Sequence, residues 1–138
     1  MKVFNIRNEM VYINLNKYRV NWDSSCKSNF QFVIKKFLET YWRNHIVVEE
    51  MRIPGTRLTL DMVNFTMRVI VETQGDQHRQ FNKFFHKDSR VQYLNGLKRD
   101  GLKIKWAELN NLIFVEIYKE DISNLNSVWF KTKFGIVL

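Results

Sequence analysis

The sequence RLTLDMVNFTMRVIVETQGDQH, residues 57–78, decides the fold that we expect for this chain. Apolar and β-branched residues dominate two runs within it, and they predict strands over 58–65 and 68–74. Thr66-Met67 would form a two-residue turn between the strands, although this pair lacks the glycine or asparagine that such turns prefer. A longer loop with a shifted strand register therefore stays open. In both cases the segment predicts a β-hairpin within a sheet.

Two acidic residues face each other across this hairpin if the turn has two residues. Asp61 then lies directly opposite Glu72, and opposed side chains project to the same side with Cβ atoms about 5 Å apart. Two carboxylates held so close repel each other unless a cation lies between them. Mg²⁺ prefers oxygen ligands, and the backbone carbonyl of Thr73 could turn toward the same ion. The hairpin therefore predicts a divalent metal site, with two unrelated polar positions on a solvated face as the alternative.

Strand alternation assigns a face of the sheet to each side chain of the hairpin. Leu60 and Met62 are expected on one face, and Asp61 and Val63 on the other. Glu72 ends a run of three apolar residues that is typical of a buried central strand. A buried acid costs free energy unless it is paired or bound, which favours a ligand role for Glu72.

The remaining sequence predicts a mixed α/β domain around the hairpin. Apolar residues recur at helical spacing over two long segments, and shorter apolar runs favour strands. We expect strands over 11–15 and 17–21, a helix over 28–42 begun near Ser24-Ser25, a strand over 45–49, a helix over 87–110, a strand over 112–118, a short helix or turn over 120–127 and an irregular tail. This order predicts a single domain over 1–138, with a mixed central β-sheet and flanking helices.

Composition limits the classes of function. Lysine and arginine total 22 against 14 acidic residues, and the net charge of +8 suits a polyanion such as nucleic acid or an anionic membrane surface. A generically basic protein is the alternative, because the basic residues are spread along the chain. Cys26, as the single cysteine, excludes an internal disulfide and is expected to be a reduced thiol. No apolar run approaches a membrane span and the N-terminus lacks a signal-peptide pattern, so we expect a soluble intracellular protein.

The hairpin also carries a family resemblance. Asp61 on one strand and the Glu-Thr-Gln of 72–74 on the next resemble the motif of the PD-(D/E)XK nuclease superfamily. The segment ETQGDQH, residues 72–78, is similar to the E-X-Q-G-X-Q-H block of phage-encoded endonucleases, which include homing endonucleases. The likeness continues into the second long helix and covers most of residues 25–118. It implies a restriction-endonuclease-like fold and Mg²⁺-dependent hydrolysis of double-stranded DNA, with Mn²⁺ able to substitute.

The resemblance implies which residues would hold the metal. Asp61 and Glu72 would bind Mg²⁺, with the carbonyl of Thr73 as a third ligand. Glu50 would bind a second ion or hold a metal-bound water from the side of the first helix, and Glu49 is the adjacent alternative. Alternation lets only one of these two glutamates face the site. A solvated surface acid is the other reading of Glu50.

Three further residues would complete a catalytic site. Gln74 stands where the family has a lysine, whose charge would stabilise the attacking hydroxide and the phosphate. Either Gln74 orients the water, or Lys103 of the second helix reaches in with Lys98 behind it, or the site is inactive. His78 would act as a general base or contact a phosphate, and a surface histidine is the alternative.

Basic residues around the hairpin predict DNA contacts. The segment 77–89 mixes Arg79, Lys83 and Lys87 with three phenylalanines, and such interleaving fits a DNA backbone beside stacking or wedging rings. Arg57, ahead of the first hairpin strand, is assigned the same role. Alternatively, the phenylalanines belong to the core and the charges are merely solvated.

The resemblance implies an active DNA endonuclease of the homing type, which would work in the host-cell cytoplasm if a phage encodes it. A double-strand break needs two sites, so a homodimer would be natural. A non-catalytic DNA-binding module with a degenerate nuclease fold is the alternative that Gln74 suggests. A structural protein that is basic by accident is a third class, and no membrane partner is expected.

Overall fold

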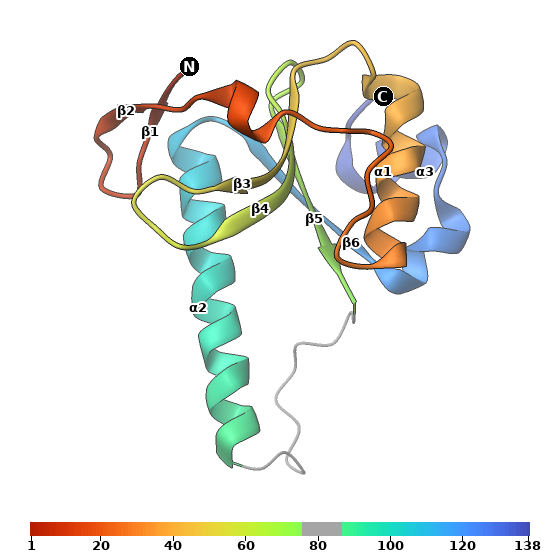
Figure 1. Ribbon diagram of the computed structural model, residues 1–138. Coiled ribbons are helices and arrows are strands. Elements are labelled where there is room, and N and C mark those ends of the chain that lie inside the picture. Colours follow the sequence, from red (N-terminus) through yellow and green to blue (C-terminus); the bar gives the residue numbers. More distant parts are fainter. Residues whose placement is uncertain (76–86) are drawn as a thin grey trace.

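The computed structural model describes residues 1–75 and 87–138, and over 87–97 it describes the backbone alone. Figure 1 shows the arrangement of the helices and strands. Their bounds are β1 (Lys2–Phe4), β2 (Met10–Tyr12), the 3₁₀ helix η1 (Leu15–Tyr18), α1 (Asn29–Trp42), β3 (Val47–Arg52), β4 (Thr59–Asn64), β5 (Val69–Gln74), α2 (Lys87–Leu109), β6 (Ile113–Tyr118), the 3₁₀ helix η2 (Lys119–Asn124) and α3 (Ser127–Phe134).

Four strands form one mixed sheet in the order β3-β4-β5-β6. The pairs β3–β4 and β4–β5 are antiparallel, whereas β5 and β6 are parallel and are joined through α2. A parallel pair needs such a long crossover, since a tight turn can only reverse the chain. β1 and β2 form a separate two-stranded hairpin. The mixed α/β class with a central sheet and flanking helices is confirmed.

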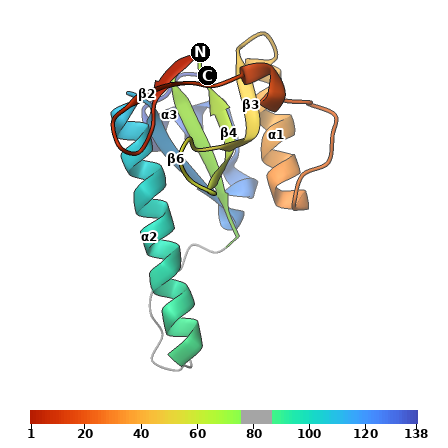
Figure 2. The ribbon, with the colours of Figure 1, turned by 60° about the vertical axis from the view of Figure 1, so that its left-hand side comes forward.

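Helices cover both faces of this sheet (Figure 1 and Figure 2). Trp106 and Ala107 of α2 pack with Val48, Leu60 and Ile70 on one face. On the opposite face, side chains of α1 and α3 pack with the alternate residues of the strands, and this cluster includes Ile34, Leu38, Trp42, Met62, Val71, Val115 and Phe130. The central strands are therefore buried on both sides, as their apolar composition predicts.

The first long helix forms where the apolar spacing predicts it. Ile34, Leu38 and Trp42 repeat every four residues, and all three are buried against the sheet. The helix is capped by Ser28, whose side chain accepts a hydrogen bond from the backbone N–H of Gln31 at 3.1 Å. The expected start near Ser24-Ser25 is therefore wrong by one turn.

Two other expected elements are wrong. The segment 17–21 is not a strand, because η1 occupies its start and only Arg19 forms an isolated bridge to β3. The tail is not irregular, since α3 begins after the cap Asn126 and ends at Gly135, whose φ is +71°. Its Phe130 is fully buried beneath the sheet, so tertiary packing stabilises a helix too short to be stable alone.

None of the helices in the described part of the chain combines the length and the apolar character that a membrane span requires.

Candidate metal and phosphate site

The sheet forks between its two middle strands. β4 and β5 pair at three positions only, 62–64 against 69–71, and a four-residue turn joins them at 65–68. The register is the one that the sequence predicts, and one step further it sets Asp61 level with Glu72. Beyond this step β4 pairs only with β3, and β5 only with β6. The two acids therefore stand at the point where the strands separate.

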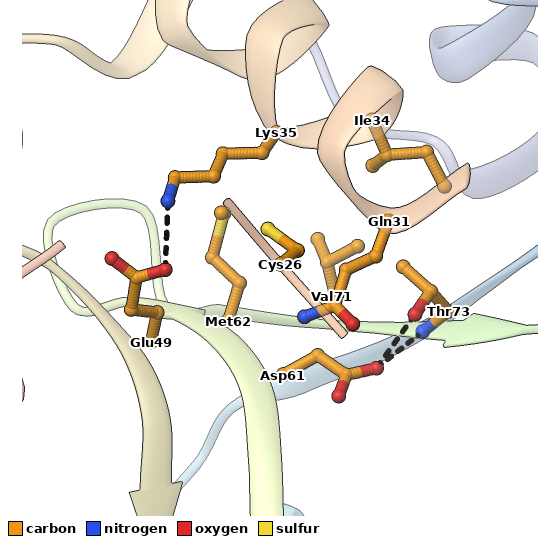
Figure 3. Close-up of a pocket in the computed structure, with 9 residues that line it drawn as sticks. All are labelled: Cys26, Gln31, Ile34, Lys35, Glu49, Asp61, Met62, Val71 and Thr73. Atoms are coloured by element: carbon orange, nitrogen blue, oxygen red, sulfur yellow. Dashed lines mark hydrogen bonds and ion pairs between the residues drawn. The ribbon is translucent and has the colours of Figure 1, made fainter. Parts of the chain in front are cut away.

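Asp61 bridges the fork with its carboxylate. Its Oδ2 accepts hydrogen bonds from the backbone N–H and from the hydroxyl of Thr73, each 2.8 Å long (Figure 3). A side chain thus supplies the contact that a regular antiparallel ladder would make with backbone groups. Because the N–H and C=O of a strand residue project toward the same neighbour, the carbonyl of Thr73 is also directed to this side. That orientation suits the ligand role expected for it.

Side-chain alternation breaks at this level of the sheet. Leu60 and Val63 both pack in the core beneath α2, whereas Met62 packs on the side of α1. The expectation of strict alternation along β4 is therefore wrong. The neighbouring strand β3 is irregular at the same level, where Glu50 stands beside Asp61 with a φ of +49°, a left-handed conformation that non-glycine residues rarely adopt. Such local strain is concentrated at functional sites.

The side chains of the neighbouring residues Glu49 and Glu50 both contact α1. Oε1 of Glu49 lies 2.8 Å from Nζ of Lys35, and Oε1 of Glu50 accepts a 3.0 Å hydrogen bond from the amide of Gln31. Lys35 and Gln31 both belong to α1, so the expectation that only one glutamate faces this side is wrong. Oε2 of Glu50 also pairs with Lys27 at 2.9 Å.

Glu72 is the most unusual acid of the site. It is 2% exposed, and its buried Oε1 accepts no hydrogen bond in the described part of the chain beyond the ion-pair contact with Lys103. Burial, followed by the charge of Asp61 and hydrogen bonding with that carboxyl, raises the pKa of Glu72 to about 9. Nζ of Lys103 lies 3.2 Å from Oε1 of Glu72, and its positive charge lowers the pKa of Glu72. Two carboxyls therefore interact directly, and Glu72 is shielded from solvent.

A lysine does reach the acids from the second long helix. Lys103 of α2 is 17% exposed and contacts Glu72, whereas Lys98 is exposed. Gln74, two residues after Glu72 on the same face of β5, is 8% exposed. The position where the resembled nuclease motif carries a lysine thus holds a buried neutral amide, and Lys103 brings a positive charge close to Glu72 from another element.

One acid stands on each strand of the sheet at this level. Glu50, Asp61, Glu72 and Glu116 occupy β3, β4, β5 and β6 in turn. Sequence reasoning missed Glu116, whose Oε2 accepts a 2.5 Å hydrogen bond from the hydroxyl of Tyr118. Among the residues that the structure describes, no three histidine, cysteine or acidic side chains converge as a complete metal centre. A metal here would therefore depend on two carboxylates together with backbone oxygen or water.

Most of the predicted DNA contacts lie outside the residues whose side chains the structure describes. His78, Arg79 and Lys83 lie outside the described residues, and Lys87 begins α2 without a described side chain. Arg57 is exposed in the turn between β3 and β4. Their roles stay predictions.

Sequence reasoning also missed the polar face of α1. Gln31 and Lys35 are four residues apart, on the same side of the helix as Ile34 and Leu38, and both are buried. Nζ of Lys35 donates to the carbonyl and the hydroxyl of Ser24, at 3.1 Å and 3.0 Å, and also to Glu49. Polar residues spaced four apart within an otherwise apolar stripe were the signal that could have revealed them.

Replacing Lys35 by methionine is expected to lower the free energy of unfolding by about 3 kcal/mol, because Glu49 is left without its buried partner. Urea unfolding measures the loss. Lys36→Met is the matched control, since the neighbouring lysine is 40% exposed and its ion pairs contribute less than about 1 kcal/mol. Equal stability of the two variants would show that the Lys35 ammonium is not held by these contacts.

The space between α1 and the sheet is closed. A cavity of about 10 Å³ lies beside Asp61 and Thr73, with Gln31 and Lys35 on its helix side (Figure 3). This volume corresponds to a single water molecule. This cavity has no room for a substrate, so a substrate would reach Asp61 by another route.

Comparison with known proteins leaves the class of this chain open. No protein-family model and no solved structure matches it. It is similar to "Uncharacterized protein 033L" of Invertebrate iridescent virus 3, with 32% identity over 90 residues. The match covers 60% of this chain and 45% of that protein, so the chain spans less than half the length of the viral relative. The viral relative is itself uncharacterized, so any function of this chain is argued from the site.

Proposed function

We propose that this chain is a metal-dependent endonuclease that hydrolyses phosphodiester bonds of double-stranded DNA, on a restriction-endonuclease-like fold. The observation that carries the proposal is the pair Asp61 and Glu72 at the fork of the sheet. A buried carboxyl whose pKa is raised to about 9, with a second carboxyl beside it, is costly for the fold alone. Strongly shifted acids of this kind are typical of functional sites.

The residues at the fork fit a hard divalent cation. Asp61, Glu72 and the carbonyl of Thr73 offer three oxygens, the ligand type that Mg²⁺ and Mn²⁺ accept. A cation between the two carboxylates would remove the repulsion that raises the pKa of Glu72. When bound, the ion supplies Lewis-acid stabilisation of the negative charge that develops on a phosphate during hydrolysis. Water would complete its coordination.

The chain's own side chains would perform the remaining tasks. Lys103 brings a positive charge to the acids and would stabilise the attacking oxygen and the phosphate. Gln74 would orient the water by hydrogen bonding from the same face of β5. Glu50, held by Gln31 and Lys27, would position a water or a second ion from the side of α1.

The net charge of +8 supports DNA as the partner, because phosphate contacts dominate the affinity of proteins for DNA. Arg57, Arg79, Lys83 and Lys87 are the proposed backbone contacts, and His78 would touch a phosphate or act as a base. A cut through both strands would require two sites and hence a homodimer.

Plasmid cleavage tests the proposal directly. Supercoiled plasmid is incubated with the protein and Mg²⁺ or Mn²⁺, with EDTA as the metal-free reference. Asp61→Ala is expected to lower the rate at least about 10³-fold, and Lys103→Met about 10²-fold to 10³-fold. Lys98→Met, an exposed lysine on the same helix, is the control and should cut like the wild type. Undiminished cleavage by Asp61→Ala would overturn the proposal.

A second candidate is a DNA-binding module without catalysis, which the buried neutral Gln74 favours. Its signature is salt-sensitive DNA binding with no cleavage in either metal. In that case Lys103→Met and Asp61→Ala would leave both properties unchanged.

A further inference from the structure

An open groove leads to Asp61 from the end of the sheet. It encloses about 520 Å³ and is lined by the start of α1, the end of β5 and the start of η2. Figure 1 shows the start of α1 beside the ends of β5 and β6. Asp61 and Thr73 line the groove as well as the closed cavity between α1 and the sheet. The proposed catalytic acid is therefore reached through this groove, which has the volume of an ordinary small-molecule site.

Two lysines from different elements line the groove. Lys27 precedes α1 and Lys119 begins η2. Lys27 has a side chain that is 66% exposed and pairs with Glu50, and this contact raises the pKa of the lysine. Exposed ion pairs of this kind are weak, so the ammonium can turn to a phosphate at little cost. Lys119 is exposed. Both charges are suited to a phosphodiester backbone.

An aromatic ring completes the lining. Phe30, in the first turn of α1, is half-buried and packs at the edge of the α1–α3 core while it also faces the groove. Protein rings commonly bind nucleic acid by stacking on a base, and only an unpaired base can offer its face. Proteins bind single-stranded DNA through lysines beside an aromatic ring, because the lysines contact the phosphates and the ring stacks on a base. A paired duplex could contact only the lysines.

We propose that this groove binds an unpaired nucleotide of the substrate strand next to the bond that is cut. Its phosphates contact Lys27 and Lys119, and its base packs on Phe30. The inference rests on the proposed function and narrows the substrate to DNA with a single-stranded or frayed segment at the cut.

Binding without metal tests the groove separately from catalysis. Fluorescence anisotropy in EDTA compares a labelled single-stranded 12-mer, a blunt duplex of the same sequence and a duplex with a three-nucleotide overhang. The wild-type protein should bind the 12-mer and the overhang at least about tenfold more tightly than the blunt duplex. Lys27→Glu and Lys119→Glu should each weaken binding of the 12-mer about tenfold. Lys2→Glu, a reversal in β1 outside the groove, serves as the control for net charge.

Phe30→Ala should remove the preference for unpaired DNA while it leaves binding of the blunt duplex unchanged. Should this variant unfold, the two lysine reversals decide the matter on their own. Equal binding of all three DNAs by the wild type, or lysine variants that bind like Lys2→Glu, would overturn the inference even if the protein cuts plasmid. A groove that binds the 12-mer as described in a protein that cuts no DNA would overturn the proposed function and leave only the binding of unpaired DNA in the groove supported.

Discussion

Replacing Glu72 by glutamine is expected to stabilise the metal-free protein and to abolish its cleavage of DNA. The amide keeps the size of the side chain but can never carry the negative charge that burial and Asp61 oppose. A metal site loses one of its two carboxylates, so cleavage should fall by at least about 10³-fold. A gain in stability together with a loss of activity is the pattern of a residue retained for function.

The direction of the pH effect follows from the shifted pKa. The folded protein holds the Glu72 proton up to a pH of about 9, whereas the unfolded chain releases it near the ordinary value of 4.5. The stability that this group contributes is therefore complete below pH 4.5 and is lost as the pH rises toward 9, at a limiting slope of about 1.4 kcal/mol per pH unit. Glu72→Gln removes this slope because an amide does not titrate.

Urea unfolding at pH 5, 7 and 8.5, in EDTA, measures the effect. The difference in stability between Glu72→Gln and the wild type should be small at pH 5 and should grow in favour of the variant at higher pH. Glu108→Gln, an exposed acid on α2, is the matched control and should leave the slope unchanged. A variant that is less stable than the wild type at pH 8.5 would show that Glu72 is a charged partner of Lys103.

The affinity of the protein for Mn²⁺ is expected to rise about tenfold for each pH unit between pH 6 and pH 8. Mn²⁺ binds the ionised carboxylate, so it must displace the proton that Glu72 still holds throughout this range. About one proton should be released for each ion bound. The expected change across the two units is about 100-fold, far more than a surface carboxylate with its ordinary pKa would produce.

Calorimetric titration in buffers of different ionisation enthalpy measures both the affinity and the released proton. Glu108→Gln should reproduce the wild-type slope, while Glu72→Gln should bind weakly and without dependence on pH. Tight binding that stays constant from pH 6 to pH 8 would remove Glu72 from the set of ligands. The same titration with Asp61→Asn tests whether both acids hold one ion.

Local sequence patterns were sufficient to predict the helices and strands whose apolar residues recur at a regular spacing. The apolar repeat of 29–42 predicts a helix, and alternating apolar runs predict the strands of the sheet. The register of the hairpin was one of two alternatives that the sequence left open, and the structure has the one that sets Asp61 level with Glu72. Because both faces of β5 are buried, the apolar pattern alone does not choose between them.

Only the tertiary structure decided how the side chains at that level are oriented. The left-handed backbone at Glu50 and the separation of β4 from β5 beyond Met62 depend on how these strands pack in the folded sheet. No residue spacing in the sequence predicts either feature. Lys103 reaches Glu72 because α2 crosses back over the sheet, a contact between residues 31 positions apart in the chain. Sequence periodicity reports the neighbours along one element, whereas the environment that shifts the pKa of a buried acid is assembled from several elements at once.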